Sequence, residues 1–179
     1  MNWMRMLVTF DIPSPQQMIC WSAPAVLMLA GCTAQGAAET PAAPSEEQAS
    51  SIHAESGLEV IPLTVTAQTG DEHGFAVEVA ASAEEQRQGL MFRTSMGADE
   101  GMIFPLAEVR MASFWMRNTV IPLDIIFIGP DNRILNIAEN TTPYSEAPVP
   151  SIAPAMAVLE LNAGRTAELG IAAGDLVEW

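Results

Sequence analysis

The apolar run FWMRNTVIPLDIIFI, at residues 114–128, constrains the fold more than any other stretch of the sequence. Its aromatic and β-branched residues fit a buried strand better than a helix. Pro122 has no N–H to donate, however, and would interrupt a single central strand. We therefore expect two strands that meet at a corner, with Asn118 and Asp124 beside that corner.

Flanking segments predict the rest of a β-rich domain. Residues 58–68 and 74–80 have strand composition and enclose a polar turn, which indicates a hairpin. Ser82 and Glu85 form a capping box, a pair that starts a helix, here expected over residues 83–91. Further strands are expected over residues 101–104, where Pro105 would end the strand, 123–128, 133–138, 156–161 and 175–179, with a helical turn over 165–169.

The expected fold class is therefore mainly β, with α+β as the alternative. We expect a compact single domain of about seven or eight strands in a barrel-like or sandwich sheet, with one or two short helices. This domain is expected to span residues 58–179, and the sequence before it differs from it in composition.

The N-terminal third has the composition of an export signal followed by a tether. Residues 18–31 are apolar and uncharged, and they lead into Leu-Ala-Gly-Cys at Cys32, which resembles the lipobox of bacterial lipoproteins. We expect residues 1–31 to be the export signal and Cys32 to be acylated, so that the bilayer is one partner. Residues 32–57 are rich in Ala, Pro, Ser and Glu, which predicts a disordered tether. A chance match to the lipobox is the alternative.

These segments together predict a location in the cell envelope. The protein would be exported, anchored in a membrane and facing the periplasm. Thr33 rather than Asp follows the cysteine, as in lipoproteins that go to an outer membrane where the cell has two membranes.

Charge and cysteine content exclude several classes of function. The chain has 7 Lys+Arg, all of them Arg, against 22 Asp+Glu, and a nucleic-acid partner is not expected because it needs a cationic face. Cys20 and Cys32 both precede the domain, so a thiol nucleophile or thiolate metal site in it is excluded. His53 lies in the tether and His73 in a turn, so we expect neither a metal site nor a cofactor. The 11 methionines are scattered in apolar sequence, which favours core packing over a copper site.

Five ordered motifs resemble one known family. They are GLMFR at residues 89–93, GMIF at 101–104, the run at 114–128, VLEL at 158–161, and the glycine turns at Gly164 and Gly174. Together they resemble the widespread prokaryotic family called domain of unknown function 192, over residues 58–179. The resemblance implies a mostly β domain, often exported, with no established activity. Arg117 stands where many members have Lys, and residues 148–154 lack an aromatic that many members place there.

Polar residues within apolar sequence are the candidates for function. A buried carboxylate without a partner costs several kcal/mol, so Asp124 either contacts a ligand or pairs with Arg93 or Arg117. Asn118 either contacts a ligand or bonds backbone amides at the corner. Glu160 could form with Asp124 a carboxylate pair for acid–base work or a hard-cation site, or it could face solvent or hold an arginine.

Two functional hypotheses follow from these candidates. If Trp115 is exposed, it and Arg117 mark a binding surface, and if it is buried, it belongs to the core. The leading hypothesis is an envelope domain that binds a small molecule, a glycan or an envelope protein through a rim of Trp115, Arg117, Asn118 and Asp124. The alternative is a small hydrolase or lyase with Asp124 and Glu160 as acid and base. Binding is favoured over catalysis, and the sequence identifies neither a ligand nor a reaction.

Overall fold

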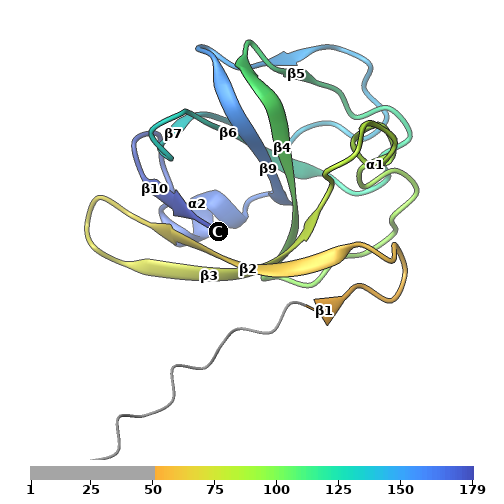
Figure 1. Cartoon of the computed structure of the whole chain (residues 1–179), viewed down its shortest axis with the longest axis horizontal. Helices are drawn as coiled ribbons and strands as arrows, with labels where there is room; N and C mark the ends of the chain where they lie inside the picture. Colours follow the sequence, from red (N-terminus) through yellow and green to blue (C-terminus); the bar gives the residue numbers. More distant parts are fainter. Residues whose placement is uncertain (1–50) are drawn as a thin grey trace, which may run out of the picture. The chain divides into compact units, whose positions relative to one another are not determined.

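A curved, mixed β-sheet organises residues 51–179, the part of the chain that this computed structural model describes (Figure 1). The predicted export signal, Cys32 and the tether up to residue 50 lie outside the described residues, so the lipid anchor stays a prediction. Within residues 51–179, every helix is too short or too polar to cross a membrane.

The described elements are ten strands and two short helices. In chain order they are β1 (Ser51–Ile52), β2 (Glu59–Thr66), β3 (Glu72–Val79), α1 (Ala83–Gln88), β4 (Glu100–Arg110), β5 (Ser113–Phe114), β6 (Leu123–Ile128), β7 (Ile134–Ala138), β8 (Val149–Pro150), β9 (Ala155–Asn162), α2 (Arg165–Leu169) and β10 (Leu176–Glu178). The main sheet has the order β1-β2-β3-β4-β9-β6-β7, with β10 paired to β2, and β5 pairs with β8. The expected mainly β single domain is thereby confirmed, in a sandwich-like rather than a closed barrel form.

Buried side chains form two clusters, one on each face of the central strands. Along β6, Ile126 and Ile128 belong to the first cluster, whereas Ile125 and Phe127 belong to the second. All six residues of β6 are buried, because both of its faces are covered. This explains why the run is continuously apolar instead of alternating with polar residues.

For the run at residues 114–128, the prediction of two strands that meet at a corner is wrong for the first strand. Only β5, which is two residues long, and β6 are strands, and a loop joins them. Asn118 has a left-handed backbone with φ 55°, a conformation that ends extended structure. The loop therefore lies outside the main sheet and is free to form a surface.

The predicted end of the third strand at Pro105 is also wrong, because β4 continues to Arg110. Pairing between β4 and the parallel β3 ends at Ile103, and the register with β9 shifts between Pro105 and Arg110. A proline is tolerated at such a strand edge or bulge because no partner needs its missing N–H.

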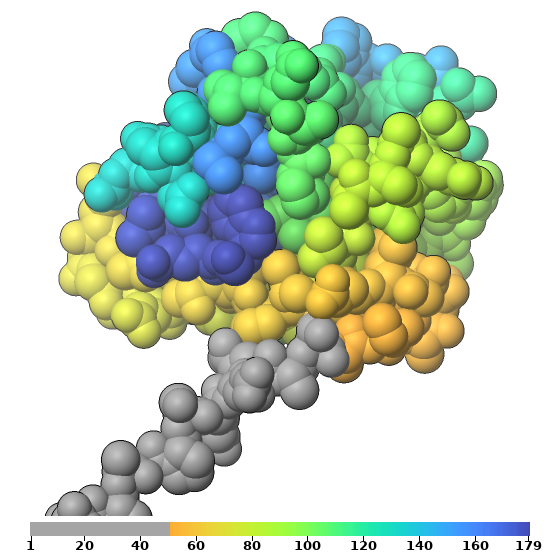
Figure 2. Space-filling view, in the orientation of Figure 1, coloured from red at the N-terminus to blue at the C-terminus, as the bar shows by residue number. Residues whose placement is uncertain are grey.

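The last seven residues of the predicted tether are part of the domain. β1 pairs with β2, and the Ser56 hydroxyl donates a hydrogen bond to the Glu78 carboxylate. Figure 2 shows this N-terminal segment, in orange, packed along the edge of the domain. Composition alone predicted disorder here because the ordering contacts come from residues far along the chain, such as Arg93.

The capping box at the start of α1 is confirmed. The Glu85 backbone N–H donates to the Ser82 hydroxyl at 3.2 Å, and the Ser82 N–H donates to the Glu85 carboxylate at 2.7 Å. The helix ends at Gln88, three residues earlier than expected, because Gly89 has a φ of 47°. The Gln86 side-chain amide donates to the Ala80 and Pro105 carbonyls, and these bonds hold α1 against the sheet although none of its residues is buried.

Candidate functional site

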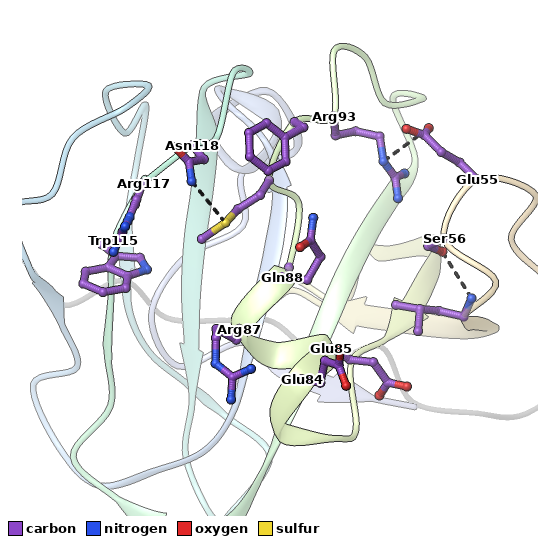
Figure 3. A pocket seen from close by; sticks show the side chains of 14 residues that line it. Glu55, Ser56, Glu84, Glu85, Arg87, Gln88, Arg93, Trp115, Arg117 and Asn118 are labelled. Carbon is purple, nitrogen blue, oxygen red and sulfur yellow. Dashed lines mark hydrogen bonds and ion pairs between the residues drawn. The ribbon is translucent and has the colours of Figure 1, made fainter.

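An open groove of about 950 Å³ lies between α1 and the loop before β6, and we call it the α1 groove. Figure 3 shows Trp115, Arg117 and Asn118 along one side of it and Glu55 and Arg93 along the other. The C-terminal part of α1 lies between the two sides. The structure thus brings together four of the six predicted site residues, namely Arg93, Trp115, Arg117 and Asn118.

Trp115 is exposed, which decides between its two expected roles. Its side chain keeps 48% of its surface accessible, whereas the neighbouring Met116 is 1% exposed and belongs to the core. The Arg117 guanidinium lies 5.7 Å from the centre of the indole ring, within the range of a cation–π contact. Arg117 also forms a loose ion pair with Glu146, at 3.9 Å. The loop therefore presents an exposed indole ring with a guanidinium over one of its faces.

Two more exposed aromatic residues are joined to this loop by backbone hydrogen bonds. The Phe92 N–H donates to the Asn118 carbonyl at 2.9 Å, and the Tyr144 N–H donates to the Thr119 carbonyl at 3.1 Å. Phe92 is 63% and Tyr144 61% exposed. Both have positive φ, 64° and 62°, a conformation that costs a residue with a side chain about 1–2 kcal/mol. Such strain gathers at functional sites more often than elsewhere, and the motifs in the sequence gave no sign of it.

Arg93 is held in a structural ion pair at the edge of the α1 groove. Its guanidinium donates to both oxygens of Glu78, at 2.8 and 3.1 Å, and lies 3.4 Å from Glu55. The hydrogen bonds with Glu78 raise the pKa of Arg93 above its ordinary value, so the guanidinium keeps its charge. Glu78 is buried, at 3% exposure. This pair has no signal in the sequence, because the two residues lie 15 positions apart and meet only in the folded domain.

Asp124 is not available to a ligand. Its side chain is fully buried and accepts hydrogen bonds from the backbone N–H groups of Asn140, Gly164 and Thr166, at 2.9, 3.0 and 3.1 Å, and from the Thr166 hydroxyl at 2.6 Å. Neither predicted partner, Arg93 or Arg117, contacts it. The carboxylate instead joins β6 to two loops and to the first turn of α2, where Gly164 has no side chain to cap the helix.

The predicted carboxylate pair of Asp124 and Glu160 is wrong. Residues that face each other across an antiparallel ladder project from the same side of a sheet, and Glu160 faces Ile125. Asp124, the next residue, therefore projects from the opposite face. The two carboxylates cannot share a proton, a water molecule or a cation. Within residues 51–179, no group of three or more His, Cys, Asp and Glu side chains is placed to hold a metal ion.

Glu160 neither faces solvent nor holds an arginine, contrary to both structural alternatives. It is 5% exposed and lines a second, smaller cavity of about 280 Å³, which shares Trp115 and residues at the end of α1 with the α1 groove. Burial raises the pKa of the Glu160 carboxyl from the usual 4.5 to about 8. A titratable group with so perturbed a pKa, at a cavity, is a candidate for function in its own right.

The fold and these two hollows define a small, mainly β domain with a strained aromatic surface beside a short helix. The chain belongs to the DUF192 family (Uncharacterized ACR), whose model matches residues 64–179. The resemblance seen in the five motifs is thus confirmed.

Two solved structures are similar over most of their length. One is a protein of unknown function from Novosphingobium aromaticivorans DSM 12444, with 54% identity and a TM-score of 0.72, covering 75% of this chain and 95% of that one. The other is a "putative transcription regulator" from Sinorhizobium meliloti 1021, with 40% identity and a TM-score of 0.66, covering 68% of this chain and 94% of that one. No curated protein matches the chain.

Proposed function

We propose that this chain is a binding module of the cell envelope, held at the membrane by acylated Cys32, and that the α1 groove binds a glycan. The exposed Trp115 ring at the side of an open groove carries the proposal. An indole face stacks on the C–H face of a sugar ring, and its large flat area loses little conformational entropy on binding. A groove of about 950 Å³ that is open to solvent suits an elongated ligand better than a small enclosed one.

The charges that line the α1 groove suit a hydroxyl-rich ligand without strong charge. The lining includes two acidic residues, Glu84 and Glu85, and two basic residues, Arg87 and Arg117. Two side-chain amides, those of Gln88 and Asn118, also line the groove. Carboxylate, guanidinium and amide groups all hydrogen-bond to sugar hydroxyls. The formal net charge of -15 disfavours strongly anionic ligands.

The same net charge argues against carrying over the regulator role named for the Sinorhizobium relative. Sequence-independent affinity for nucleic acid comes from Lys and Arg that neutralise phosphates. This chain has 7 basic against 22 acidic residues, so we do not propose a nucleic-acid partner.

Replacing Trp115 by alanine is expected to weaken glycan binding about tenfold, because the stacking surface is lost. The full chain in detergent would be titrated calorimetrically with N-acetylglucosamine oligomers and with soluble peptidoglycan fragments. Trp179→Ala is the matched control, since Trp179 is 39% exposed, follows β10 and does not line the α1 groove. Absence of binding to every glycan, or equal affinity in wild type and Trp115→Ala, would refute the glycan proposal. If position 115 were instead found crosslinked to a protein, the α1 groove would be assigned to a protein partner.

The backbone strain at Phe92, on the same surface, can be tested by measuring stability. Phe92→Gly and Phe92→Ala both remove the exposed ring, but only glycine adopts positive φ without steric cost. We expect the glycine variant to be more stable than the alanine variant by about 1 kcal/mol, the reverse of the usual order. Urea unfolding followed by circular dichroism measures the difference. Equal stability of the two variants would show that the backbone at Phe92 is not strained.

A further inference from the structure

Glu160 is a buried acid at the middle of the sheet that no interaction within residues 51–179 explains. It lies on the central strand β9, between Met102 on β4 and Ile125 on β6. Burial alone perturbs its carboxyl group, with no contribution from a hydrogen bond or an opposite charge. Buried acids that serve only structure are satisfied by donors, as Asp124 is by four, so the missing partner of Glu160 points to a ligand.

The cavity that Glu160 lines, which we call the Glu160 cavity, has an apolar middle and a cationic outer end. Its walls include Leu90, Phe104 and Phe114, of which the first two are buried. Its two arginines, Arg87 and Arg110, are exposed and therefore lie at the solvent side. Glu160 is the sole acidic residue among those that line it. The cavity thus runs from a buried carboxyl group, past hydrocarbon, to guanidinium groups in water.

We propose that the Glu160 cavity binds a small molecule with a primary ammonium group at one end, an apolar middle and an anionic group at the other. The ammonium would donate hydrogen bonds to the Glu160 carboxylate, and the anionic group would meet Arg110. The aromatic walls add cation–π attraction for the ammonium end. A volume of about 280 Å³ holds a ligand of a few carbon atoms, near the lower limit of small-molecule sites. This inference does not rest on the glycan proposal, because Glu160 and Arg110 do not line the α1 groove.

Binding of an ammonium group at Glu160 has a protonation signature. With a pKa of about 8, the carboxyl group of the free protein is largely protonated at neutral pH. A cation binds its ionised form, so complex formation releases a proton to the buffer. Affinity should then rise about tenfold per pH unit below 8 and level off above it. A ligand held only by the apolar walls would show neither effect.

The experiment titrates the full chain with the ω-amino acids from γ-aminobutyrate to ε-aminocaproate, and with hexylamine and hexanoate, which each lack one charged end. Calorimetry in buffers of different ionisation enthalpy measures proton release. We expect at least one ω-amino acid to bind with proton release at neutral pH. We expect Glu160→Gln to weaken binding about tenfold to a hundredfold and to abolish the release, since a charge-assisted hydrogen bond is lost. Glu178→Gln serves as the control and should bind as wild type, because Glu178 is the exposed residue of β10.

The arginine end is tested separately. Arg110→Ala should weaken ω-amino acid binding and leave hexylamine binding unchanged, because hexylamine has no anionic group. Failure of the whole series to bind, binding without proton release, or unchanged affinity in Glu160→Gln would each overturn the inference. Trp115 lines both hollows, whereas Glu160 and Arg110 line only the Glu160 cavity, so the Glu160→Gln and Arg110→Ala variants test this inference separately from the glycan proposal.

Discussion

Replacing Asp124 by alanine is expected to lower the free energy of unfolding by about 3–5 kcal/mol. The carboxylate accepts three backbone N–H groups and one hydroxyl, all from segments that lie far from β6 in sequence. Alanine would leave these donors buried without acceptors, at about 1–3 kcal/mol for each one that water does not reach. Few single substitutions have so large an effect.

Urea unfolding at neutral pH measures this loss, and graded variants separate its parts. Thr166→Val removes one donor and keeps the carboxylate, so it should cost about 1 kcal/mol. Asp131→Ala is the matched control, because Asp131 lies in the exposed β6–β7 turn and accepts one long hydrogen bond, from the Arg133 N–H at 3.3 Å. A loss in Asp124→Ala no larger than that in Asp131→Ala would contradict the structural role assigned to Asp124.

Replacing Glu160 by glutamine is expected to flatten the dependence of stability on pH. The pKa of Glu160 is about 8 in the folded domain and near the usual 4.5 in the unfolded chain. Folding therefore favours the protonated acid, and its contribution to stability is fully present below about pH 4.5. This contribution is lost as the pH rises towards 8, by about 1.4 kcal/mol per pH unit, and is constant above that value. Glutamine does not titrate, so the variant should lose none of it.

Denaturant unfolding at a series of pH values tests this expectation. The difference in stability between Glu160→Gln and wild type should grow in favour of the variant by several kcal/mol from acidic to mildly alkaline pH. Glu178→Gln should follow the wild-type curve, because Glu178 is exposed. Parallel curves for Glu160→Gln and wild type would show that Glu160 ionises normally in the folded protein, and the ammonium proposal would lose its protonation signature.

Elements with local signals were predictable from the sequence. The β2–β3 hairpin and the capping box at Ser82 both depend on neighbouring residues, and both are confirmed. Errors arose where distant segments intervened. Pro105 is tolerated inside β4 because the pairing with β3 has already ended there, which its own sequence context does not reveal.

The candidate site was predictable only in part, for the same reason. The apolar run correctly drew attention to Trp115, Arg117 and Asn118, because polar residues in such a run need an explanation. It could not show that Asp124 projects from the opposite side of the sheet from Glu160, since this depends on the register of β6 against β9. The strained Phe92 and Tyr144 and the buried Glu78 were missed because their partners lie elsewhere in the chain.

The sequence by itself determined the mainly β class, the family and the turns, because periodicity, capping and turn chemistry act over a few residues. Tertiary structure alone decided which acid is satisfied and which is not. Asp124 and Glu160 are both carboxylates in apolar strands, and only the long-range pairing gives one of them four donors and the other an apolar cavity. The environment of a buried charge is set by groups that the fold brings to it from afar, and its chemistry follows from them.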